Sequence, residues 1–245
     1  MADAPAQDMR ITVTDNGPYL VSGGIPLVRL EIVVNEAGES VGWREIERLE
    51  TADEYMLCRC GRSSTKPFCD FSHVAAGFVG TEQAAHVRYF ESAACVDGSG
   101  LRLHDVRALC AEARFCDRAG GLWNLVEQDD DPEIRALVEE EAKLCPSGRY
   151  VVCDASADEP IEPDLEPSIA LIEDPHLGVS GPLFIRGGIP VFAADGTPFE
   201  VRNRATLCRC GASGNKPFCD GSHVGVGFVD GVGRAGESEA GDADG

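Results

Sequence analysis

Two stretches of the chain carry cysteine and histidine at the same spacing, C-x-C-x8-C-x3-H. The two sets are Cys58, Cys60, Cys69 and His73, and Cys208, Cys210, Cys219 and His223. Three thiols and one imidazole can close around a structural zinc ion, which accepts Cys3His ligation, or around a [2Fe–2S] cluster with mixed Cys and His ligands. Zinc pairs are usually two to four residues apart, so cysteines separated by one residue favour the iron–sulfur alternative.

A third group of cysteines lies between these sets. Cys110 and Cys116 enclose five residues, and the dipeptide Cys145-Pro146 follows. On a continuous helix six steps of about 100° would turn the first two thiols roughly 240° apart, so they converge only if the segment wraps around an object such as a cluster. Candidates for a fourth ligand are Cys153, Cys95, His104 and Glu112. The alternative is that these cysteines only pack, as small buried hydrophobic residues do.

Composition limits the function classes. The 42 acidic residues against 21 Lys and Arg give a formal net charge of −21, which argues against binding to nucleic acid or to an anionic membrane surface. The sequence has neither an apolar run of spanning length nor an apolar N-terminal signal segment, so we expect a cytoplasmic protein. Thiols stay reduced in that compartment, and the eleven cysteines therefore indicate metal ligands rather than disulfides.

A duplication organises the elements that position these residues. GPYLVSGGIPLV, beginning at Gly17, and GPLFIRGGIPVF, beginning at Gly181, each precede one of the matched cysteine loops. The apolar alternation over residues 28–34 predicts a strand. Each copy therefore predicts short strands with Gly-Gly and Pro turns, followed by a cysteine-rich loop.

The sequence between the two copies has a different pattern. Asp131-Pro132 predicts the start of a helix that ends at Cys145-Pro146, and a second helical stretch is expected over residues 106–118. The expected domains are a β-rich repeat over 1–84, a cluster domain over 85–153, an acidic Pro-rich linker over 154–167, a second repeat over 168–230 and a disordered acidic tail over 231–245.

The residues between the ligands resemble the CDGSH (NEET-type) iron–sulfur motif. The matching hydroxyl, proline and acidic positions are Ser63, Pro67 and Asp70 in the first copy and Ser213, Pro217 and Asp220 in the second. The first copy departs once, with Phe71 at a glycine position where a positive φ is expected. The resemblance implies a redox-active [2Fe–2S] cluster in each copy, with two Cys on one iron and Cys plus His on the other. Outer-shell candidates are Lys66, Asp70, Lys216 and Asp220, of which the two aspartates are expected to orient the loops.

The central segment resembles the divergent mono-cluster ferredoxin domain that accompanies CDGSH motifs in some bacterial proteins. Ala113 stands where single-cluster bacterial ferredoxins have their middle cysteine. The resemblance therefore implies a [3Fe–4S] cluster, or a [4Fe–4S] cluster with an unusual fourth ligand.

The family's usual pair of subunits under a shared β-sandwich implies an α+β fold. We expect the two repeats to pack as a pseudo-dimer within a monomer, with a small helical ferredoxin-like lobe inserted between them.

Three functions follow from these expectations. The first is an electron carrier, not an enzyme and without catalytic residues, that serves a reductase or an oxygenase. The second is a redox- or pH-sensitive sensor, or a donor of clusters to an apo iron–sulfur acceptor, because a protonated imidazole cannot hold iron. The third is a zinc-stabilised interaction scaffold.

Overall fold

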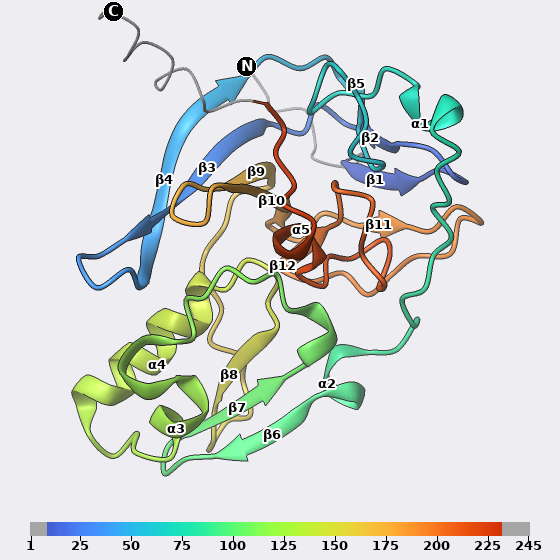
Figure 1. Cartoon of the computed structure of the whole chain (residues 1–245). Helices are drawn as coiled ribbons and strands as arrows, with labels where there is room; N and C mark the ends of the chain where they lie inside the picture. The colour runs from blue at the N-terminus through green and yellow to red at the C-terminus, as the bar shows by residue number, and fades with distance from the viewer. Residues whose placement is uncertain (1–8, 232–245) are drawn as a thin grey trace, which may run out of the picture.

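The computed structural model describes residues 9–231, and within them the chain is a mixed α+β protein built mostly of strands in three sheets (Figure 1). The first repeat contains β1 (Arg10–Val13), β2 (Tyr19–Ser22), β3 (Leu27–Val34), β4 (Ser40–Leu49), β5 (Glu54–Leu57) and helix α1 (Ser72–Ala75). The central segment contains α2 (Tyr89–Ser92), β6 (Ala94–Asp97), β7 (Leu101–Asp105), α3 (Leu122–Val126), α4 (Pro132–Leu144) and β8 (Tyr150–Asp154). The second repeat contains β9 (Ser168–Asp174), β10 (Val179–Arg186), β11 (Val191–Phe192), β12 (Arg204–Leu207) and α5 (Ser222–Gly225). Apart from Gly231, the expected acidic tail lies outside the described residues.

Each of the two larger sheets combines strands from both repeats. One has the order β11-β1-β2-β5, and the other has the order β12-β10-β9-β3-β4. In the first sheet, β1 of the first repeat pairs in parallel with β11 of the second repeat. In the second sheet, the equivalent strand β9 of the second repeat pairs in parallel with β3 of the first repeat. Apart from the additional strand β4, each sheet therefore takes three strands from one repeat and one from the other.

The core lies between these two sheets and also draws on both repeats. Its fully buried members include Tyr19 and Leu57 from the first repeat and Ile169 and Leu207 from the second. The alternation that predicted a strand over residues 28–34 is confirmed by β3. Arg29 lies on the face of β3 opposite to Val28 and Leu30 and is also buried. Its ion pairs with Glu173 and Asp230 stabilise the buried charge.

The central segment forms a lobe of its own (Figure 1, green to yellow) that contains more than helices. Strands β6, β7 and β8 form an antiparallel sheet, and α3 and α4 pack against one face of it around Leu103, Val126 and Val138. The expected small helical lobe is therefore a helix-and-sheet lobe. None of the helices in residues 9–231 is long and apolar enough to cross a membrane.

Helix α4 forms where the sequence predicts it. The Asp131 side chain accepts a hydrogen bond from the backbone N–H of Glu133, Pro132 occupies the first turn, and the helix ends at Leu144, directly before Cys145-Pro146.

The prediction of a helix over 106–118 is wrong. A 3₁₀ turn, Arg107–Leu109, is followed by an irregular loop in which Glu112 and Arg114 have positive φ. That conformation is incompatible with a right-handed helix.

The loop is held against the repeats by an aromatic contact. Phe115 is 1% exposed, and its ring lies 4.8 Å from that of Trp43 and joins the cluster around Ile172 and Phe184. The sheet that carries both repeats therefore fixes the position of the central cysteine loop.

Glu141, on α4, is fully buried, and neither of its carboxylate oxygens forms a hydrogen bond within the described residues. Burial raises the pKa of Glu141 to about 8, although Arg118 lies 3.3 Å away. A raised carboxyl pKa means that the folded chain binds more protons than the unfolded chain. The stability contributed by protonated Glu141 is therefore present below about pH 4.5 and is lost as pH rises towards 8.

We therefore expect Glu141→Gln to raise the free energy of unfolding at pH 8 by about 2 kcal/mol and to change it little at pH 5. The gain is smaller than the pKa shift alone implies, since Arg118 loses a charged neighbour. Urea denaturation at the two pH values measures the difference. An equal change in the free energy of unfolding at pH 5 and pH 8 would show that burial does not raise the pKa of Glu141.

Candidate metal centres

The two matched cysteine loops have the same backbone hydrogen bonds. Cys58 N–H donates to the carbonyl of Pro67 at 2.8 Å, and Cys208 N–H donates to that of Pro217 at 2.8 Å. In each loop a serine hydroxyl reaches the carbonyl of the phenylalanine before the third cysteine, Ser63 at 2.6 Å and Ser213 at 2.7 Å. The repeated sequence thus gives two loops of one geometry.

Within each loop the donor atoms come in pairs. The Sγ atoms of the first two cysteines are 3.7 Å apart in the first loop and 3.6 Å apart in the second. The third cysteine Sγ lies 3.6 Å from Nδ1 of His73 in the first loop and 3.5 Å from Nδ1 of His223 in the second. Two thiolates bound at about 2.3 Å to one tetrahedral metal ion lie roughly 3.8 Å apart, so each pair fits one metal.

No three His, Cys, Asp or Glu side chains within residues 9–231 converge to hold a single ion. Two separate donor pairs per loop instead suit a binuclear cluster, in which each iron takes two protein ligands.

The thiols are held in surroundings that disfavour two free thiolates side by side. The pKa of Cys208 is lowered, first because Cys210 donates a hydrogen bond to it and also because backbone N–H groups and Lys216 face it. The pKa of Cys210 is raised, chiefly because its thiol donates the hydrogen bond to the Cys208 thiolate and would lose that bond on deprotonation. Burial raises the pKa of Cys60 and of Cys219. A bound metal is what would allow all of these groups to be thiolates at once.

The four outer candidates make loop contacts. Asp70 accepts hydrogen bonds from the backbone of Ser64 and Ser72, and Asp220 accepts them from the backbone of Gly214 and Ser222. The two lysines, Lys66 and Lys216, each donate from Nζ to a serine carbonyl, of Ser63 and Ser213 respectively, at 2.6 Å. All four side chains therefore form hydrogen bonds that orient the backbone of their own loop.

The two loops differ in their surroundings. His73 is half-buried, with the exposed Phe71 ring 5.9 Å from its imidazole, whereas His223 is 4% exposed. The central lobe covers the second loop at Gly221, where a Cβ atom would lie 2.5 Å from Cγ of Glu112. Phe71 has φ 65°, the positive value expected for this glycine position, and Gly221 has φ 87°.

We expect Phe71→Gly to stabilise the chain by about 1 kcal/mol, because glycine adopts positive φ without the strain that a side chain suffers. The matched change Gly221→Ala should be destabilising, because it adds both that strain and a clash with Glu112. Urea denaturation of the two variants tests the pair. Destabilisation by Phe71→Gly would show that its contact with His73 outweighs the backbone strain.

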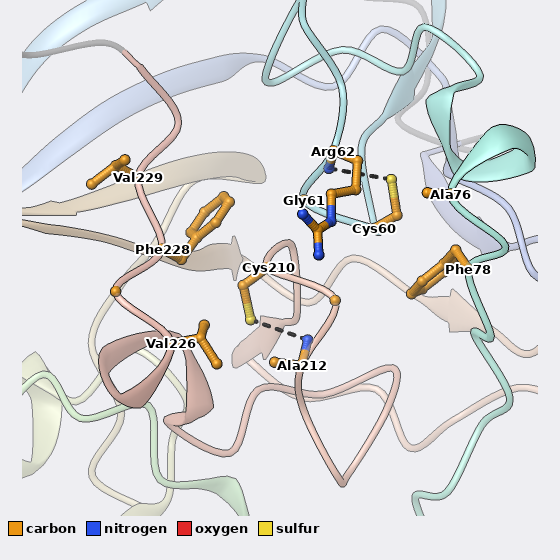
Figure 2. A pocket seen from close by; sticks show the side chains of 12 residues that line it. Cys60, Gly61, Arg62, Ala76, Phe78, Cys210, Ala212, Val226, Phe228 and Val229 are labelled. Atoms are coloured by element: carbon orange, nitrogen blue, oxygen red, sulfur yellow. Dashed lines mark hydrogen bonds between the residues drawn. The ribbon is translucent and has the colours of Figure 1, made fainter.

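The two loops touch each other across a groove (Figure 2). A Cβ atom on Gly61 would lie 2.6 Å from the carbonyl oxygen of Cys210, and one on Gly211 would lie 2.7 Å from that of Cys60. Both glycines have positive φ, and side chains such as Phe78 and Phe228 line the groove. The backbones that carry the two ligand loops are therefore in contact.

The central cysteines line a separate, small cavity of about 20 Å³. Its walls are Cys110 to Cys116, Cys145, Pro146, Arg149 and Tyr150. Burial raises the pKa of Cys116 to about 12. The loop curves around this cavity, and the residues Cys110, Cys116 and Cys145 all line it.

Only one of the four fourth-ligand candidates lines this cavity. Glu112 does, with Oε1 3.4 Å from Sγ of Cys110. Cys95, His104 and Cys153 lie on the three-stranded sheet, on strands β6, β7 and β8 respectively, and are not among the lining residues.

Sequence reasoning missed three arginines. Arg59 and Arg209 each stand between the first two cysteines of a loop and are buried, and the identical C-R-C of both copies is the signal that points to them. Arg149 lines the central cavity with Cys110 and is held by Asp105 at 2.7 and 2.8 Å. Its guanidinium places a positive charge beside the thiols, where an anionic cluster would be stabilised.

Comparison with protein-family models agrees with this geometry. Residues 16–74 and 180–224 match the model described as iron-binding zinc finger CDGSH type. Residues 96–155 match the model described as divergent 4Fe-4S mono-cluster. Neither the curated proteins nor the solved structures that were compared give a match. The resemblances stated from the sequence are thereby confirmed, and the chain carries two CDGSH iron-binding segments of the [2Fe–2S] type that flank a divergent 4Fe–4S mono-cluster domain.

Proposed function

We propose that this protein is an electron carrier that moves single electrons through three iron–sulfur clusters. The observation that carries the proposal is contact between successive ligand loops. The first CDGSH loop touches the second through Gly61 and Gly211, and the second touches the central loop at Gly221, where the nearest atoms belong to Glu112 and Cys110. Electrons can pass between clusters held by adjoining loops within the one chain.

In this proposal each CDGSH cluster is held by its two donor pairs. The ligands are Cys58 with Cys60 and Cys69 with His73 in the first loop, and Cys208 with Cys210 and Cys219 with His223 in the second. Replacing one thiolate by a neutral imidazole lowers the negative charge on the cluster, which raises its reduction potential above that of an all-cysteine site.

The central cluster takes Cys110, Cys116 and Cys145, and Glu112 is the fourth ligand in our proposal because it lines the cavity. We expect Glu112→Ala to yield a protein with one iron fewer, whose central site gives a [3Fe–4S] signal by electron paramagnetic resonance in the oxidised state. Glu112→Gln controls for packing against Gly221. A central cluster that keeps four irons in Glu112→Ala would exclude Glu112 as a ligand.

The exchange of equivalent strands between the two large sheets supports a pseudo-dimer within one chain. Apart from the additional strand β4, each repeat contributes one strand to the other's sheet, and both share one core. In this arrangement the repeats are the two halves of a cap and the central lobe is an insertion between them. The two CDGSH loops meet where the halves meet.

The net charge of −21 supports a redox partner with a basic docking face, such as a reductase or an oxygenase. We propose to test carriage directly by mixing the reduced holoprotein with a basic haem protein as electron acceptor. The second-order rate constant should fall by at least about tenfold between 20 and 300 mM salt. Reduced clusters that transfer no electrons on the timescale of seconds would argue against carriage, and a rate indifferent to salt would refute the electrostatic docking.

One observation favours a second role as a sensor or donor of clusters. His73 is half-buried, with the exposed ring of Phe71 beside it, whereas the central lobe covers the second loop at Gly221. The first cluster is therefore the one that can be released. Transfer to an apo-ferredoxin that proceeds faster than electron transfer to any acceptor would favour this role.

A further inference from the structure

Cys95 differs from every other cysteine in the chain. All eleven lie within residues 9–231, and Cys95 is the one that is exposed. It lies on β6, the edge strand of the three-stranded sheet, directly opposite His104 on β7. Residues opposite each other on antiparallel strands share one face of the sheet, and here Sγ of Cys95 lies 3.0 Å from Nδ1 of His104.

The imidazole of His104 has the thiol as its one hydrogen-bond partner within the described residues. The residue is 8% exposed, and its Nε2 atom is buried without a partner. The Phe90 ring meets the imidazole edge-on, with ring centroids 4.9 Å apart. Burial is the main cause that lowers the pKa of His104, and the nearby Arg102 adds to it, while Asp97 and Asp158 oppose it. A neutral imidazole beside a thiol is an arrangement that can take the thiol proton.

This pair is separate from the central cluster cavity. The face of the sheet that carries Cys95 and His104 is opposite the face that packs on α3 and α4 through Leu103 and Val152. Neither Cys95 nor His104 lines the cavity around Cys110. The Cys95 thiol is therefore open to reagents in solution, whereas every cysteine proposed as a cluster ligand is buried or half-buried.

We propose that Cys95 and His104 form a thiol-exchange site for small disulfides. Nδ1 of His104 accepts the thiol proton as Sγ of Cys95 attacks one sulfur of the disulfide. A bond forms between Cys95 and that sulfur, the disulfide bond breaks, and the departing thiolate takes the proton. Cys95 is oxidised to a mixed disulfide, and the other half of the reagent leaves as a reduced thiol.

The mixed disulfide should persist because Cys153, the other cysteine on this sheet, is too far from Cys95 to resolve it. Cys153 lies on β8, and β7 runs between β8 and β6. Two strand spacings are about 9.5 Å, which exceeds the separation of about 7 Å that a disulfide tolerates. Cys153 is also only 1% exposed.

The test uses the anaerobic holoprotein and oxidised glutathione as the probe. Intact mass and peptide mapping should show one glutathione adduct, on Cys95, while the visible absorption of the clusters is unchanged. Cys95→Ser should abolish the adduct, and Cys153→Ser should leave its rate unchanged. His104→Gln should slow adduct formation at pH 7 by about tenfold and should make the rate climb more steeply with pH than in the unmodified protein.

Two outcomes would overturn the proposal. One is an adduct rate in His104→Gln equal to that of the unmodified protein, with the cluster absorption showing that the variant is folded. The other is modification of the cluster cysteines before Cys95.

Discussion

Replacing Arg209 with methionine is expected to lower the free energy of unfolding by about 3–5 kcal/mol and to release the second CDGSH cluster. The Arg209 side chain is 3% exposed and donates to Asp230 at 2.6 Å and to Glu173 at 2.9 Å. It also donates to the carbonyl oxygens of Gly181 and Ile172. Without Arg209, Arg29 still forms ion pairs with the carboxylates of Glu173 and Asp230. The loss of one positive charge leaves this buried site with an excess negative charge. Urea denaturation, read both by circular dichroism and by cluster absorption, measures the loss.

The first repeat offers a matched control. Arg59 stands at the equivalent position and is equally buried, but its hydrogen-bond acceptors are the backbone carbonyls of Thr14 and Gly80. Arg59→Met leaves backbone carbonyls without this donor but adds no excess buried charge, and it should cost about 1–3 kcal/mol. Equal losses in the two variants would contradict the argument from buried charge.

In mild acid the first cluster should be lost at least tenfold faster than the second. Iron binds neutral imidazole, so protonation of the histidine competes with the cluster. His223 is buried beneath the central lobe, and burial lowers its pKa to about 4. The unfolded chain binds this proton more readily than the folded chain, so the stability contributed by neutral His223 is present above about pH 6.5 and is lost as pH falls towards 4. His73 is half-buried and more open to solvent.

Loss of cluster absorption at pH 5 should therefore follow two phases. The variants His73→Cys and His223→Cys assign them, because a cysteine ligand removes the acid-sensitive imidazole from one site at a time. His73→Cys should abolish the fast phase, and His223→Cys should affect the slow one. A fast phase that survives in His73→Cys would contradict the assignment.

Local sequence patterns predicted the parts of this molecule that depend on neighbouring residues. The duplicated spacing predicted two equivalent loops, and their backbone hydrogen bonds match residue for residue at Cys58 and Cys208. The Asp131-Pro132 signal predicted the start of α4, because an N-cap and a first-turn proline act within one helical turn. The glycine departure at Phe71 predicted a strained position, and its φ is 65°.

Features that depend on distant contacts could not be predicted. The loop at 110–116 has helical composition, yet it curves around a cavity with positive φ at Glu112. The difference in burial between His73 and His223 arises because the central lobe packs on the second CDGSH loop at Gly221, whereas Phe71 at the equivalent position is exposed. Nothing near either histidine in the sequence encodes that difference. Arg29, which shares the Asp230 carboxylate with Arg209, lies on β3 and so comes from the other repeat.

The measurement that tests the three-cluster electron carrier most directly combines metal analysis with a reductive titration of the anaerobically purified protein. Two [2Fe–2S] clusters and one [4Fe–4S] cluster predict about eight irons, about eight acid-labile sulfides and about three electrons taken up per chain. Zinc without sulfide, and no electron uptake, would contradict the account and leave an interaction scaffold.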